Sequence, residues 1–133
     1  MRAGIGVGAD GVAVFTNITP EFSRSVSGRP VGDRARSAAY LGVDALLVSG
    51  QMAGVSAEMD DLRAAKAAVD ELPVLANTGV THDNMASILE VADGVIVGTS
   101  LKVDGSTWNA VDPQRARHAA ELAAAARQRA GVR

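Results

Sequence analysis

Two turns rich in glycine and hydroxyl side chains lie about twenty residues apart in this chain. Each turn follows a short apolar run of the kind that forms a buried strand. Backbone N–H groups in such turns, helped by nearby hydroxyl groups, can bind a phosphate group. We therefore predict a phosphate site formed by six residues, namely Thr78, Gly79, Val80, Gly98, Thr99 and Ser100. The alternative is that these glycines only allow a tight change of chain direction.

Other polar residues lie at or just beyond the ends of expected strands. In a parallel barrel the segments that follow the strands meet at one rim, where substrate contacts are made. We predict rim contacts from Asn17, Ser49, Gly50, Lys102 and Asp104. Lys102 has a simpler reading as a solvated loop lysine beside Asp104, since most lysines are exposed.

Familiar catalytic motifs are missing from the sequence. There is no Gly-x-Ser-x-Gly motif, no P-loop and no cysteine. Neither His82 nor His118 has a second histidine three or four residues away, the usual spacing of helical metal ligands. We therefore expect no metal and no cofactor, and the catalytic residues stay unknown.

Composition limits the classes of partner. The chain has 133 residues, which we interpret as a single domain over 1–133, with a net charge of −2. This charge predicts no binding to nucleic acid. No segment reaches the roughly 20 apolar residues of a transmembrane segment. We expect a cytoplasmic protein.

Helix and strand patterns alternate regularly along the chain. We predict strands at about 12–18, 44–49, 73–77 and 94–98. We predict helices at about 31–41, 56–71, 81–91 and 112–130. Short connections between such elements indicate an α/β fold of four βα units with parallel strands.

The segment after residue 91 resembles a known family. It reads ADGVIVGTSLK over 92–102, continues with Trp108-Asn109, and ends with Val111-Asp112-Pro113. This pattern resembles the C-terminal part of the BtpA/SgcQ family, and weaker matches occur at Thr78-Gly79-Val80-Thr81 and over 44–50. The resemblance implies the C-terminal half of a TIM (β/α)8 barrel of the ribulose-phosphate-binding type.

The resemblance also frames the functional alternatives. It favours binding of a phosphorylated small molecule at the turns after the last two strands. The family's named member is associated with photosystem I biogenesis, so the alternative is a non-catalytic assembly factor that acts through protein–protein contacts. Family members carry an Asp and then a Lys-His pair after the first strand, where this chain has Asn17, Glu21 and Phe22. These replacements leave catalysis doubtful.

Four βα units leave half of a barrel to be explained. Two exposed parallel edge strands favour pairing with another chain. We therefore expect either a homo-oligomer that completes an eight-stranded barrel or a truncated member whose N-terminal half is missing. A flattened, doubly wound sheet is a third arrangement that the sequence alone leaves open.

Overall fold

The structure is a computed structural model, and it describes residues 11–23, 25–52, 54–129 and 131. Four strands form one sheet in the order β1-β2-β3-β4, and every neighbouring pair is parallel. The strands are β1 (Phe15–Asn17), β2 (Ala45–Ser49), β3 (Val74–Asn77) and β4 (Gly94–Val95). The expected α/β fold with four parallel strands is confirmed.

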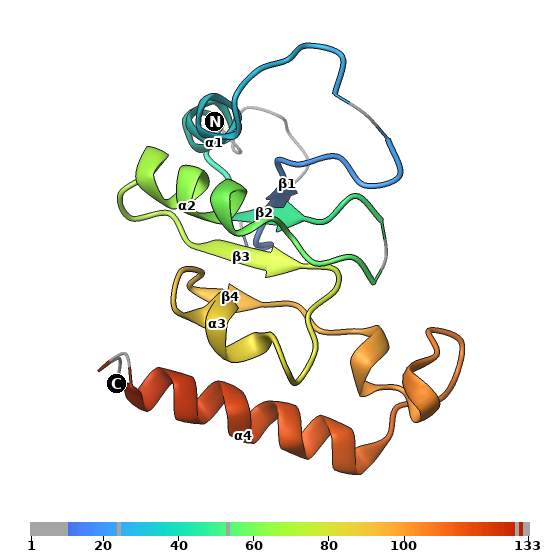
Figure 1. The fold of residues 1–133 in the computed structure, drawn as a ribbon. Coiled ribbons are helices and arrows are strands. Elements are labelled where there is room, and N and C mark those ends of the chain that lie inside the picture. Colours follow the sequence, from blue (N-terminus) through green and yellow to red (C-terminus); the bar gives the residue numbers. More distant parts are fainter. Residues whose placement is uncertain (1–10, 24, 53, 130, 132–133) are drawn as a thin grey trace.

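A helix follows each strand (Figure 1). The helices are α1 (Val31–Tyr40), α2 (Met59–Ala68), α3 (Met85–Leu89) and α4 (Pro113–Arg129), with short 3-10 helices η2 (Thr99–Leu101) and η3 (Val103–Gly105) before α4. A doubly wound sheet would reverse its strand order and carry helices on both faces. The sequential order of these strands rules that arrangement out.

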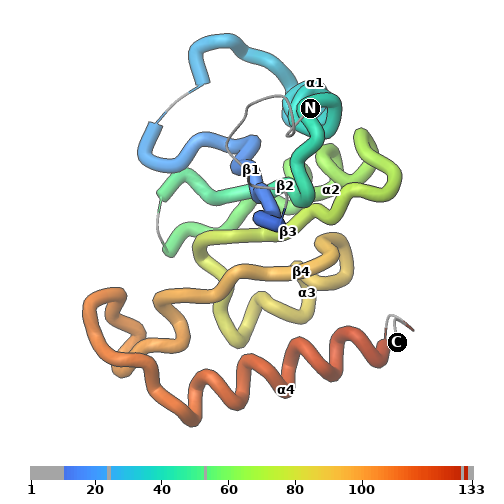
Figure 2. Tube along the Cα trace, turned by 180° about the vertical axis from the view of Figure 1, so that it is seen from behind, coloured from blue at the N-terminus to red at the C-terminus, as the bar shows by residue number. Residues whose placement is uncertain are grey.

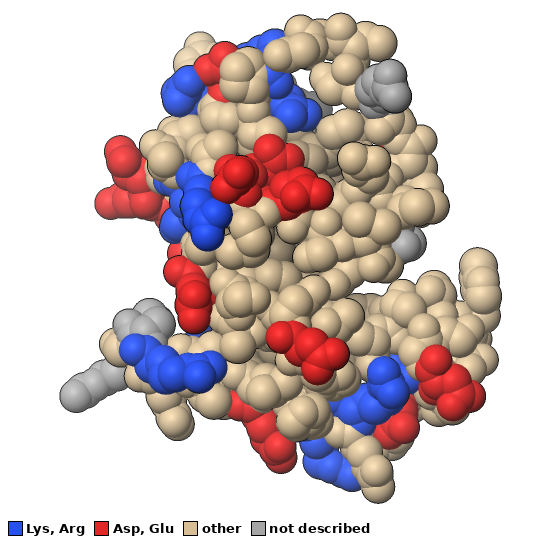
Figure 3. Space-filling view, in the orientation of Figure 1, with Lys and Arg blue, Asp and Glu red and all other residues tan. Residues whose placement is uncertain are grey.

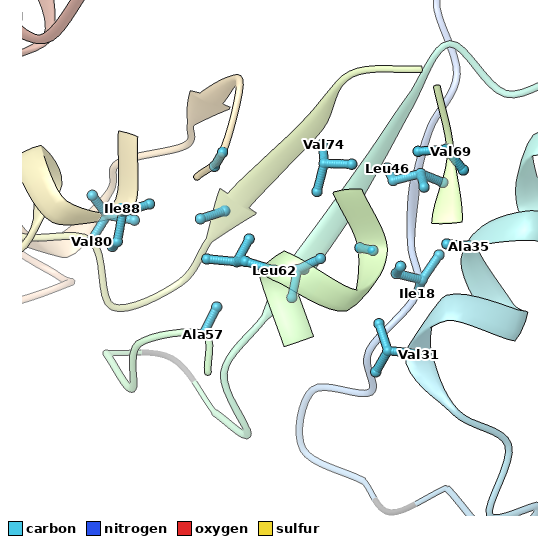
Figure 4. Close-up of a cluster of buried hydrophobic side chains, with 14 of the residues drawn as sticks. Ile18, Val31, Ala35, Leu46, Ala57, Leu62, Val69, Val74, Val80 and Ile88 are labelled. Atoms are coloured by element: carbon cyan, nitrogen blue, oxygen red, sulfur yellow. The ribbon is translucent and has the colours of Figure 1, made fainter. Parts of the chain in front are cut away.

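Alternate residues of the central strands face the helices. Leu46 in β2 and Val74 in β3 are fully buried, and so is Leu62 of α2. Figure 4 shows these side chains between the helix and the strands. Burial of a leucine side chain contributes about 1.5–3 kcal/mol, so this layer holds α2 on the sheet.

The opposite face of the sheet is open among the described residues. Figure 2 shows the strands from this side, with α2 and α3 behind them. Leu47 and Leu75 are adjacent on neighbouring strands and only partly buried, and Phe15 is 50% exposed. Since side chains alternate along a strand, these residues occupy the face that would line the inside of a closed barrel.

The segment after β4 differs from the expected extended strand. Pairing with β3 ends at Val95, and Gly98 adopts φ −126° and ψ −87°. The carbonyl of Gly98 then accepts a hydrogen bond from Leu101 N at 3.0 Å, which begins η2. The chain therefore turns at Gly98 and does not extend the sheet.

Two helices begin later than the sequence suggested. Helix α2 begins at Met59, because Glu58 is still extended with ψ 131°. Before α3, Thr81 N donates to Asn84 Oδ1 at 2.7 Å, and this turn delays the helix to Met85.

Charged side chains in the view of Figure 3 gather over the helices and the segment after β4. The loops that follow β1 and β2 are mostly uncharged in this view. No helix in the described part of the chain is long and apolar enough to cross a bilayer. The cytoplasmic location stays a prediction.

Candidate functional site

A pocket of about 450 Å³ opens at the carboxyl ends of β3 and β4. Its lining includes all six residues that the sequence singled out, which are Thr78, Gly79, Val80, Gly98, Thr99 and Ser100. The parallel pairing of β3 with β4 explains this, because parallel strands end at the same edge of a sheet. Their role in phosphate binding stays a prediction.

Backbone donors are available in both turns. Within the described residues, no hydrogen bond occupies the N–H groups of Gly79, Val80, Gly98, Thr99 or Ser100. Because a buried N–H without a partner is costly, such groups usually bond to water or ligand. The five residues that carry these N–H groups all line the same pocket.

The hydroxyl groups have other roles. Thr78 Oγ1 accepts a hydrogen bond from Gly50 N at 2.8 Å and donates to Val55 O at 3.1 Å. Ser100 Oγ donates to Val80 O at 2.8 Å, which links the two turns. Thr99 Oγ1 lies 2.9 Å from Thr107 Oγ1 on the surface. The hydroxyls of Thr78 and Ser100 therefore shape the pocket, and the backbone is its main source of donors.

Arg115 adds a positive charge that sequence reasoning missed. It lines the pocket, and its Nε donates to Ser100 O at 2.7 Å. Among the described residues no carboxylate lies within 4.0 Å of its guanidinium. One edge of the guanidinium is thus fixed to the turn, and its other N–H groups have no hydrogen-bond partner among the described residues. A positive charge in the first turn of a helix interacts unfavourably with the helix dipole. An arginine at this position is therefore a sequence feature that could have indicated a functional role.

The position of Arg115 is set by the start of α4. Asp112 Oδ1 accepts hydrogen bonds from Gln114 N at 2.8 Å and Arg115 N at 3.3 Å. His82 Nε2 lies 2.9 Å from Arg115 O, and the His82 ring stacks on that of His118 with centroids 5.0 Å apart. In the described part of the chain, no three acidic or histidine side chains are grouped to hold a metal ion.

A second polar group joins the ends of β1, β2 and β3. Asn17 Nδ2 donates to Ser49 Oγ at 2.5 Å, and Ser49 Oγ donates to Asn77 Oδ1 at 2.7 Å. Asn77 Nδ2 then donates to Glu21 Oε1 at 2.9 Å. We call Asn17, Glu21, Ser49 and Asn77 the strand-end network. Two of its members, Glu21 and Asn77, line the pocket, whereas Asn17 and Ser49 lie outside its lining and form hydrogen bonds to them.

The other predicted rim residues lie outside the pocket lining. Gly50 packs so closely on the Val55 carbonyl that a Cβ atom would overlap it. Lys102 forms an isolated antiparallel bridge with Val111, and Asp104 sits in η3 with φ +56°. Lys102 and Asp104 are therefore not among the lining residues, although Gly105, which follows Asp104 in η3, is one of them.

The two glycines of the pocket have different surroundings. Gly79 has φ +61°, and a Cβ atom there would overlap the backbone of Val55 and Ser56. Gly98 has a negative φ, and a Cβ atom there would meet nothing within 4 Å.

Comparison with known proteins identifies the family of this chain. The model of the BtpA family matches residues 1–125. The chain belongs to the BtpA family. SgcQ, a putative sgc region protein of Escherichia coli K12, is 37% identical over 110 residues, which cover 82% of this chain and 41% of that protein. The photosystem I biogenesis protein BtpA of Synechocystis is 36% identical over 72 residues, which cover 54% of this chain and 25% of that protein.

A solved structure shows the same fold. The N-(5'-phosphoribosyl)anthranilate isomerase of Pyrococcus furiosus, a TIM barrel, superposes with a TM-score of 0.55 at 18% identity. The match covers 87% of this BtpA-family chain and 52% of the isomerase. The four βα units therefore correspond to about half of a TIM barrel. The chain spans less than half the length of the two BtpA-family relatives named above.

Proposed function

We propose that the chain binds a phosphorylated small molecule in the pocket between the turn at 78–80 and the turn at 98–100. One observation carries the proposal. The same pocket is lined by five residues with unpaired backbone N–H groups and by Arg115, whose guanidinium has no acidic partner among the described residues. Phosphate oxygens are acceptors without donors when the group is fully ionised, so they match this set.

The remaining lining suits the body of such a ligand. Val80 and Ile96 supply apolar surface, and Ile96 is 44% exposed. Small-molecule sites commonly combine apolar walls with a few placed polar groups. The proposal concerns binding and includes no reaction. The name of the isomerase includes a phosphoribosyl group, but its 18% identity supports only the fold.

Isothermal titration with propyl phosphate tests this proposal. Substitution of Arg115 by Gln removes the charge, and we expect about tenfold weaker binding, since a charge-assisted hydrogen bond contributes about 1.5–3 kcal/mol. Arg117→Gln is the matched control, because Arg117 is exposed on α4 outside the pocket. The control should bind as the wild-type chain does. No heat of binding and no thermal stabilisation by propyl phosphate would contradict the proposal.

The open face of the sheet would be covered by another polypeptide in a complete barrel. We assign it to a second copy of this chain, whose β1 would pair with β4 and whose β4 would pair with β1. The match to 52% of a complete barrel chain supports this, because two such halves supply its eight strands. Light scattering after gel filtration should give a dimer. A folded monomer that resists dilution would contradict it, and an unfolded chain rescued by the N-terminal half of a relative would assign the face to that half.

A non-catalytic assembly factor is the second candidate function. The observation that favours it is the same open face, on which Phe15 is 50% exposed, and the Synechocystis relative is named a biogenesis protein. This function predicts that propyl phosphate gives no stabilisation and that the open face binds a different protein. A chain that binds propyl phosphate and forms its own dimer would contradict it.

A further inference from the structure

The pocket carries opposite charges on its two sides. Arg115 reaches it beyond β4 through the carbonyl of Ser100. Glu21 comes from the segment after β1 and meets Asn77 at the end of β3. A carboxylate repels phosphate, so Glu21 has no role in holding the phosphate group itself. Its place in the lining needs another explanation.

The strand-end network fixes Glu21 firmly. Its Oε1 accepts a hydrogen bond from Asn77 Nδ2 at 2.9 Å and a longer one from Asn17 Nδ2 at 3.4 Å. Both amides are themselves oriented by Ser49 Oγ. Glu21 Oε2 has no hydrogen-bond partner among the described residues. One oxygen thus anchors the carboxylate, and the other is free to accept.

Glu21 is not needed to hold its own segment against the sheet. Thr19 already does this, because its Oγ1 accepts from Ser49 N at 2.6 Å and donates to Ser49 O at 3.1 Å. Phe22 N also donates to Gln51 O at 2.9 Å. The segment therefore stays in place without the carboxylate, and this favours a ligand-directed role for Glu21.

An oriented carboxylate oxygen is a strong acceptor for the hydroxyl groups of a ligand. We infer that the pocket takes the phosphate monoester of a polyhydroxylated compound, with the phosphate at the two turns and a hydroxyl group on Glu21. This inference rests on the proposed phosphate binding and adds the class of ligand. It makes Glu21, oriented by Asn77, the residue that distinguishes a hydroxylated ligand from a plain alkyl phosphate.

A matched pair of ligands tests the inference. Glycerol 3-phosphate and propyl phosphate have the same carbon chain and phosphate, and they differ only in two hydroxyl groups. With the full chain, isothermal titration should show about tenfold tighter binding of glycerol 3-phosphate, as expected for one charge-assisted hydrogen bond. The ratio of the two dissociation constants is the readout, because effects on the phosphate cancel in it.

Two variants test whether Glu21 causes the difference between the two dissociation constants. Glu21→Ala should reduce it to about one, whereas Arg115→Gln should weaken both ligands and leave the ratio unchanged. Glu71→Ala is the control, since it removes the same charge from an exposed position between α2 and β3. The control should keep the wild-type ratio. If circular dichroism shows that Glu21→Ala is unfolded, Glu21→Gln replaces it and should also lower the ratio.

The outcomes separate the two proposals. Equal binding of both ligands by the wild-type chain would overturn this inference while the phosphate proposal stands. A ratio that survives in the folded Glu21 variant would overturn it as well. Binding of neither ligand would overturn the phosphate proposal and the inference with it.

Discussion

The two glycine turns of the pocket look alike in the sequence but differ in the structure. Gly79 has φ +61° and lies against the backbone of Val55 and Ser56 with no room for a side chain. Gly98 has a negative φ and open space where its Cβ would be. The first turn is packed into the fold, whereas the second has open space at its glycine.

This difference shows that one sequence pattern can have two physical causes. At Gly79 the missing side chain lets the loop after β2 close against the end of β3. At Gly98 nothing in the fold requires glycine for space, so its small size is available for the close approach of a ligand. We therefore expect stability to depend on the first turn and binding to depend on the second.

The largest effect should come from Gly79→Ala. The new methyl group would overlap the backbone of Val55 and Ser56 at a positive φ, and we expect a loss of about 3 kcal/mol in the free energy of unfolding. Urea unfolding measures it. Gly42→Ala is the control, because Gly42 has φ +79° but open space around its Cβ position. It should lose only about 1 kcal/mol. Equal losses would show that the close contact has no cost of its own.

The next effect concerns binding at the second turn. Gly98→Asp places a negative charge where the phosphate is expected, and we expect at least about thirtyfold weaker binding of propyl phosphate. Its urea midpoint should stay that of the wild-type chain, since the site has open space. Ser106→Asp is the control, because it adds the same charge outside the pocket lining. If Gly98→Asp unfolds the chain, the conclusion that only the first turn is needed for stability is wrong.

A smaller effect is expected at the hydroxyl of the first turn. Thr78→Val keeps the shape of the side chain but leaves Gly50 N without its acceptor. Loss of this hydrogen bond should cost about 1 kcal/mol in the free energy of unfolding. Urea unfolding is again the measurement. An unchanged midpoint would show that the hydroxyl does not hold the loop after β2.

The smallest effect is expected at the corresponding threonine of the second turn. In the part of the chain that the structure describes, Thr99 Oγ1 has one hydrogen-bond partner, Thr107 Oγ1, and that contact is exposed. Thr99→Val should therefore change the free energy of unfolding by less than about 0.5 kcal/mol. A loss as large as that of Thr78→Val would remove the distinction between a packed turn and an open one.

Much of this arrangement could be predicted from the sequence. Alternation of helix and strand patterns was enough to predict four parallel strands, and strand ends in such a sheet must share one edge. This is why the residues of both turns could be assigned to one place from the sequence alone. The same rule placed Asn17 and Ser49 at the ends of their strands, and it applied equally to Asn77, which ends β3. Their contact with a ligand stays a prediction.

The parts that escaped prediction depend on contacts between distant segments. Arg115 is held at the pocket by its hydrogen bond to the carbonyl of Ser100. These two residues are 15 positions apart, and no local sequence pattern predicts a contact over that separation. Lys102 was expected at the rim, but it lies between the 3-10 helices η2 and η3 and is not part of the pocket lining. Short 3-10 turns lack a distinct hydrophobic period, so pattern reading does not detect them.

The two-residue β4 has a consequence for assembly. A contact in which β4 of one copy meets β1 of the next is heterologous, and such contacts either close into a ring or continue as a filament. Two copies form a ring only if each half turns the sheet through half a circle. A flatter sheet would continue to add copies, and the few backbone groups of Gly94–Val95 would hold each junction weakly. The apparent mass at increasing concentration therefore reports the curvature of the sheet: it reaches a plateau for a ring and keeps rising for a filament.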